Sequence, residues 1–99
     1  MIIHRWQAPI LPTEEQALSL LKFEGFDASI EILSGQKHIK DHRHALSEIL
    51  FITHGELIVN ISGNQVLLRM GDRIEIPANT KHSYDSPYGE CRVIFGYKV

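Results

Sequence analysis

The segment HRHALSEILFITHG, at residues 42–55, joins two histidines and a glutamate to a run of apolar residues. Side chains two residues apart lie on the same face of a β-strand, so His42 and His44 are expected to project the same way. Glu48 has the same parity if the strand continues in that register. Imidazole nitrogens and carboxylate oxygens are ligands that divalent transition metals accept. The segment therefore predicts a strand that carries part of a metal site.

An exposed hydrophilic strand is the alternative interpretation, because charged residues surround the two histidines. It does not explain Glu48, which directly precedes the apolar residues 49–52. A buried carboxylate is costly unless it is paired or coordinates an ion. His82 is the fourth candidate ligand; taken alone, it would be interpreted as a loop histidine after the turn at Pro77. Together with the other three residues, it completes a ligand set.

Two motifs connect these residues to a known family. Gly35, His42, His44, Glu48 and Gly55 form a pattern. This pattern is similar to the first cupin motif, G-x5-H-x-H-x3,4-E-x6-G, with one extra residue after the first glycine.

The second motif lies further along the chain, where Gly71, Pro77, Asn79, His82 and Ser86 resemble the cupin pattern G-x5-P-x-G-x2-H-x3-N. Asn79 stands where the motif has glycine, which is a mild departure because asparagine readily takes the left-handed backbone conformation. Ser86 stands where the motif has asparagine, outside the ligand set.

The resemblance to cupins implies a jelly-roll β-barrel, or double-stranded β-helix, of the single-barrel kind. It also implies that His42, His44, Glu48 and His82 hold one manganese, iron, nickel, cobalt, copper or zinc ion. Such a set leaves one or two open positions on a five- or six-coordinate ion, where water or a substrate oxygen can bind. The affinity of such sites for divalent metals generally follows the Irving–Williams order whatever the ligands. The ligand residues therefore do not select the metal.

One helix is predicted at about residues 13–24. Thr13 is suited to the N-cap, acidic residues follow in the first turn, and Gly25 is placed to end the helix. Its spacing favours packing against the domain through Ala17, Leu18 and Leu21.

After the helix the hydrophobic period changes to two. Phe26, Ala28, Ile30 and Ile32 alternate with polar residues, which predicts a strand with one buried face. Further short strands are expected at residues 48–53, 56–61, 65–70, 73–76, 81–84 and 91–97, with turn residues between them. This pattern favours an antiparallel sandwich or barrel, so the predicted organisation is one all-β domain over residues 1–99, with the barrel at about 26–99.

The strand at residues 48–53 is apolar on both faces. One face fills the barrel, while the face with Ile49 and Phe51 needs cover from the helix or from another chain. Because cupins commonly pair through their sheets, the resemblance implies a homodimer.

Composition excludes several classes of protein. The 99 residues, 43% of them hydrophobic, suit one modest core. Ten basic and twelve acidic residues form no basic stripe, which argues against nucleic-acid binding. The single cysteine, Cys91, cannot form an internal disulfide, and no apolar run of membrane length or signal-peptide pattern is present. We therefore expect a cytoplasmic protein without a membrane partner.

Two weaker candidates for a substrate pocket are Tyr84 and His38. Tyr84 shares parity with His82; the alternative is a core aromatic with its hydroxyl at the surface. His38 shares parity with His42; the alternative is a solvated loop, because lysines flank it.

Several functions are compatible with this site. Cys91 shares a strand face with Val93 and Phe95 and is interpreted as a core residue, which leaves no candidate nucleophile. A metal-dependent enzyme, such as a dioxygenase or isomerase acting on a small molecule, is the first hypothesis, with its catalytic residues unassigned. A small-ligand binding or sensing module is the second, and a structural or storage-like role without turnover is the third. Function depends on the site and not on the fold, so the resemblance does not choose a substrate.

Overall fold

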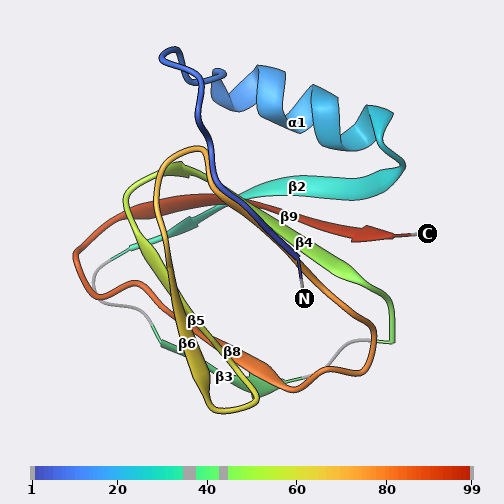
Figure 1. The fold of residues 1–99 in the computed structure, drawn as a ribbon, viewed down its shortest axis with the longest axis vertical. Coiled ribbons are helices and arrows are strands. Elements are labelled where there is room, and N and C mark those ends of the chain that lie inside the picture. Colours follow the sequence, from blue (N-terminus) through green and yellow to red (C-terminus); the bar gives the residue numbers. More distant parts are fainter. Residues whose placement is uncertain (1, 35–37, 43–44, 99) are drawn as a thin grey trace.

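Two antiparallel sheets face each other in the computed structural model, and one helix lies outside them (Figure 1). The structure describes residues 2–34, 38–42 and 45–98. Its elements in chain order are β1 (Ile2–His4), α1 (Glu14–Phe23), β2 (Phe26–Leu33), β3 (His38–His42), β4 (Glu48–His54), β5 (Leu57–Ile61), β6 (Asn64–Leu68), β7 (Arg73–Ile76), β8 (His82–Asp85) and β9 (Cys91–Lys98). This arrangement confirms the predicted all-β class with one short helix. That the chain forms a single domain stays a prediction.

The larger core lies between the sheets. One sheet has the strand order β1-β7-β4-β9-β2, and the other has the order β3-β8-β5-β6. Alternate residues of the strands meet in this core, among them Leu50 of β4, Val59 of β5 and Val93 of β9. Cys91 belongs to the same cluster, which confirms its interpretation as a core residue.

The helix begins and ends where the sequence predicts. The Thr13 hydroxyl accepts a hydrogen bond from the backbone N–H of Gln16 at 3.1 Å, and the Gln16 side chain accepts one from the Thr13 N–H at 2.9 Å. This reciprocal pair satisfies two donors that a helix start leaves open. Gly25 follows the C-cap Glu24 with φ of +96°, a conformation that glycine adopts without steric cost.

Helix α1 covers the outer face of the five-stranded sheet, on the side away from β3, β5, β6 and β8 (Figure 1). Ala17 and Leu21 are fully buried in a second cluster that contains Ile49 and Phe51. Of the two predicted ways to cover this face, the helix is therefore the one that the fold uses. The 10-residue α1 is too short to cross a membrane, and the described part of the chain contains no other helix.

The prediction of a fully buried face on β2 is wrong in its second half. Phe26 and Ala28 are buried under the helix, but Ile30 and Ile32 are 36% and 51% exposed. The physical reason is that the buried residues of α1 pack on the first half of this edge strand only.

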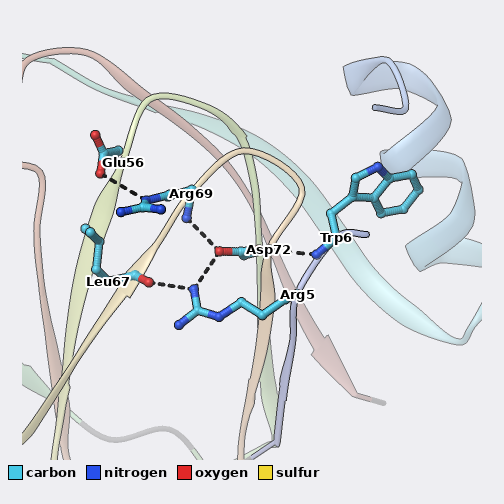
Figure 2. A network of polar contacts seen from close by, with 6 residues as sticks. All are labelled: Arg5, Trp6, Glu56, Leu67, Arg69 and Asp72. Carbon is cyan, nitrogen blue, oxygen red and sulfur yellow. Dashed lines mark hydrogen bonds and ion pairs between the residues drawn. The ribbon is translucent and has the colours of Figure 1, made fainter. Parts of the chain in front are cut away.

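The N-terminal segment also joins the sheet, which sequence patterns did not indicate. Strand β1 pairs antiparallel with β7, and the following residues, Arg5 and Trp6, dock on the turn before β7 (Figure 2). There Asp72, almost fully buried, accepts hydrogen bonds from Arg5 Nη1 at 2.6 Å, from the Trp6 N–H at 3.3 Å and from the Arg69 N–H at 2.9 Å. A Cβ atom on Gly71 would lie 2.5 Å from the Trp6 Cβ, so this turn needs glycine for close approach.

Candidate metal centre

Two of the four predicted ligands meet in the space between the sheets. Glu48 begins β4 in one sheet, and His82 begins β8 in the other. Their side chains are about 1% exposed, and His82 Nε2 lies 2.9 Å from Glu48 Oε1. The burial predicted for Glu48 from the apolar run after it is thus confirmed, and the carboxylate is paired as burial requires.

The turn before β8 orients His82. Asn79 has φ of +60°, which confirms the left-handed conformation expected at this position of the motif. Three residues later, His82 Nδ1 lies 2.7 Å from the Thr80 carbonyl oxygen. A carbonyl oxygen only accepts, so Nδ1 carries a hydrogen and Nε2 is the nitrogen presented to Glu48. A metal-binding histidine is held in this way, with its second nitrogen donating to a carbonyl or carboxylate.

A proton or a metal ion is needed between His82 and Glu48. With the hydrogen on Nδ1, neutral His82 would turn a lone pair on Nε2 toward the Glu48 carboxylate, and two acceptors repel at 2.9 Å. The contact is attractive only when a proton lies between the two atoms. A divalent ion bound by both side chains would replace that proton.

Two tyrosines lie beside the same carboxylate. The Tyr84 hydroxyl donates a hydrogen bond to Glu48 Oε1. Tyr97 is the register partner of Glu48 on β9, so the two side chains share a face of the sheet. Burial and the Glu48 charge raise the pKa of each phenol well above its usual value. Both phenols are therefore neutral at neutral pH.

Tyr84 combines features of the two interpretations given for it above, a residue that faces the site and a core aromatic. Its ring is buried in the core, with its centroid 5.6 Å from that of Phe95 and 5.2 Å from that of His82. Its hydroxyl does not reach the surface, as a simple core tyrosine would, but turns inward to Glu48. The prediction that Tyr84 contacts a substrate stays a prediction.

Tyr97 is the site residue that sequence reasoning missed. A signal was present, because Cys91, Val93 and Phe95 alternate toward the core and Tyr97 is the next residue in that alternation. The strand pattern alone does not tell that Glu48 lies opposite Tyr97, since cross-strand register depends on the whole sheet.

The backbone of β3 brings residue 42 beside His82. The β3–β8 pairing places His42 opposite His82, after an irregularity between residues 39 and 42. The side chain of His42, together with Gly35 and His44, lies outside the described residues, and these two ligands stay predictions. Among the described residues, no group of three histidine, cysteine, aspartate or glutamate residues forms a cluster that could hold an ion.

The pairing of β3 with β8 removes the parity that connects His38 with His42. The register partner of His38 is Asp85, three residues from His82. Simple parity between His38 and His42 does not hold across the irregularity, because one strand advances by more residues than the other. The pocket role predicted for His38, whose side chain is also outside the described residues, stays a prediction without that support.

Glu48 is one of the residues that line a pocket of about 300 Å³. The pocket is also lined by Phe26 and its register partner Lys98, and by Glu75, the partner of Ile49. Phe26 and Ile49 belong to the outer cluster under the helix, and register partners share a face of the sheet. These residues place part of the pocket on the outer face, while Glu48 and its register partner Ile76, which belongs to the core between the sheets, line it as well.

Comparison with known protein families assigns residues 28–97 to the cupin domain model. The chain belongs to the cupin family. The match covers most of the chain, including Glu48, His82 and both tyrosines. It confirms the resemblance that the two motifs indicate.

Individual relatives of this cupin include enzymes. The chain is 39% identical over 54 residues to an acireductone dioxygenase from Alcanivorax borkumensis, a match that covers 50% of this chain and 30% of that protein. The chain thus spans about a third of the length of this curated relative.

Solved structures show the same fold. A cupin superfamily protein from Desulfitobacterium hafniense has a TM-score of 0.70 at 13% identity, covering 77% of this chain and 69% of that chain. Salicylate 1,2-dioxygenase from Pseudoaminobacter salicylatoxidans has a TM-score of 0.67 at 23% identity, covering 72% of this chain and 21% of that chain. At these identities the likeness shows the fold, and it confirms the predicted cupin jelly roll.

Proposed function

We propose that this cupin binds one divalent transition metal ion through His42, His44, Glu48 and His82. The observation that carries the proposal is the contact between Glu48 and His82, in which a fully buried carboxylate meets a histidine with its tautomer fixed by Thr80. Nitrogen and oxygen donors of this kind suit manganese, iron, cobalt, nickel, copper or zinc. The register of β3 supports His42 as a third ligand, because residue 42 lies opposite His82.

We propose further that the site serves a metal-dependent enzyme that acts on a small molecule, of the dioxygenase or isomerase kind. The partial likeness to an acireductone dioxygenase supports this choice. A bound ion would supply Lewis-acid polarisation, or redox chemistry if the ion is redox-active. The role of the protein is then to hold the ligands, to keep Tyr84 and Tyr97 neutral and to shield the centre from water by burial.

A binding or sensing cupin without turnover is the second candidate. It is favoured by the two phenols beside Glu48, whose raised pKa values make them poor proton-transfer groups at neutral pH. Efficient proton transfer at neutral pH needs a group whose pKa lies near that pH.

A screen with defined metals separates the two candidates. Metal-free protein is loaded with each candidate ion, and small phenols, keto acids and sugars are tested for thermal stabilisation, for product and for oxygen uptake. An enzyme gives metal-dependent product, and Glu48→Gln reduces turnover even with metal in excess, because the anionic ligand tunes the charge of the ion. Compounds that stabilise the protein without product for any ion favour the binding module.

We also propose that the protein is a cytoplasmic homodimer. The cytoplasmic location is supported by the single buried cysteine, which needs no oxidising compartment. The dimer is supported by the cupin family and by the apolar residues Ile30 and Ile32, which are exposed on the edge strand β2.

A further inference from the structure

We propose that Tyr84 and Tyr97 are positioning residues that fix the carboxylate of Glu48 for the ion. This inference rests on the proposed metal site and assigns the two phenols a role in it. Tyr84 donates to Glu48 from β8 in the opposite sheet, whereas Tyr97 lies opposite it on β9, the strand next to β4. The carboxylate thus has a phenol beside it from each sheet.

Tyr84 fixes one oxygen of the carboxylate. Its hydroxyl donates to Oε1, the same oxygen that lies 2.9 Å from His82 Nε2. The ring cannot swing away, because it is buried and packs edge-on against Phe95 and beside His82. Oε1 is therefore kept beside the ligand nitrogen before any ion binds.

Tyr97 flanks the carboxylate from its own sheet. Directly paired residues of antiparallel strands share a face, with Cβ atoms about 5 Å apart. Tyr97 and Glu48 are such a pair, so the phenol limits the space in which the carboxylate can turn. Tyr97 is half-buried, so its hydroxyl can be removed with less disturbance of the core than that of Tyr84.

A phenol can donate only one hydrogen bond, and this favours a positioning role for Tyr84. The hydroxyl of Tyr84 has one hydrogen to donate, and it is used on Glu48. While this bond is kept, Tyr84 cannot donate the same hydrogen to a substrate. Outer partners of this kind orient a metal ligand, and their loss typically weakens metal affinity by about 10- to 100-fold. The geometry therefore favours a role through Glu48 over a direct substrate contact.

Cobalt titration tests the inference without any substrate. Co²⁺ is added to metal-free wild-type protein and to the variants Tyr84→Phe, Tyr97→Phe and Tyr88→Phe, and its visible absorption bands are recorded. Tyr88 is 72% exposed and serves as the matched control. We expect wild type and Tyr88→Phe to agree. Each of the other two variants should bind Co²⁺ about tenfold or more weakly. Their bands at saturation should shift, because the carboxylate is no longer fixed.

The outcomes separate this inference from the proposed function. Wild-type protein that fails to bind Co²⁺ contradicts the metal site itself. If wild type binds and both variants keep its affinity and spectrum, the positioning role is wrong while the metal site stands. Weaker binding with an unchanged spectrum at saturation also overturns the inference, because a merely structural effect lowers occupancy without altering the bound ion. Circular dichroism checks that each variant folds. If Tyr84→Phe does not fold, the Co²⁺ affinity and spectrum of Tyr97→Phe decide whether the positioning role is right.

Discussion

At the scale of single residues, Glu48 connects the sequence pattern to the site. A carboxylate before an apolar run predicts a buried charge with a partner, and in the structure His82 and Tyr84 contact that carboxylate while Tyr97 lies opposite it on β9. Because buried polar contacts strengthen one another in a low dielectric, the residues form one network and not separate pairs. Substitutions within it are therefore expected to be non-additive.

Cys91 is predicted to be inert in the folded protein. It is fully buried, and burial raises the pKa of its thiol to about 11, so the reactive thiolate is scarce at pH 8. Ellman's reagent at pH 8 should label native protein far more slowly than protein unfolded in guanidinium chloride. The unfolded protein is the control, and it should give one labelled thiol per chain. Equally fast labelling of both would contradict the buried position.

The sequence predicts those site residues that local chemistry singles out. Glu48 and His82 follow from residue type, and the left-handed Asn79 follows from the motif. The parity argument that linked Glu48 to His42 along one strand is wrong, because β3 ends at His42 and Glu48 begins β4 in the other sheet. The role of Tyr97 does not follow from local chemistry, because it depends on which residue faces Tyr97 across two strands. The same limit explains His38, where one irregularity in β3 changes the register that parity assumes.

At the scale of elements, the docking of the N-terminal segment is predicted to depend on Asp72. Replacing Asp72 with Ala leaves three donors, from Arg5, Trp6 and Arg69, without their acceptor. Since part of this site is accessible to water, we expect a loss of about 1–3 kcal/mol in the free energy of unfolding. Urea unfolding measures it, with Asp27→Ala at an exposed position as the control. Equal stability of the two variants would contradict the docking role.

The ion pair between the C-cap of α1 and β7 predicts a dependence of stability on pH. Arg73 donates to both carboxylate oxygens of Glu24, at 2.8 and 3.0 Å, and this hydrogen-bonded pair lowers the pKa of Glu24 below its ordinary value of 4.5. A lowered folded-state pKa stabilises the fold above the ordinary value, and this contribution is lost as pH falls through the folded-state pKa.

Glu24→Gln should therefore be less stable than wild type at pH 7, with the difference shrinking toward pH 3. The difference at pH 7 should be at most about 1 kcal/mol, because Glu24 is one-third exposed and screened by water. Urea unfolding at the two pH values measures it, and the exposed Glu31→Gln controls for net charge. A difference independent of pH would show that the pair does not act through ionisation.

Elements with their own local signals are predictable, whereas elements made by long-range pairing are not. The capping residues Thr13 and Gly25 predict α1, and turn residues separate most strands. Strand β1 has only three residues and exists because β7 offers it an edge. The exposure of Ile30 and Ile32 likewise depends on how far α1 extends over the sheet, which alternation along β2 does not report.

At the scale of the whole molecule, the proposed dimer must use surface that α1 does not cover. The helix already buries Ile49 and Phe51, so that face offers no interface, whereas Ile30 and Ile32 remain exposed. Light scattering at micromolar concentration should give twice the chain mass of 11.3 kDa. A mass near that of one chain, independent of concentration, would contradict the dimer and leave the metal site unaffected.

Metal content tests the central claim most directly. Elemental analysis of wild type and the variants His44→Ala, His82→Ala and His54→Ala should give about one divalent ion per chain for wild type, because the four ligands form one set. His54 is exposed at the end of β4 and provides the control. We expect His54→Ala to keep the ion and the other two variants to lose most of it. Equal occupancy in all four proteins would contradict the proposed metal centre.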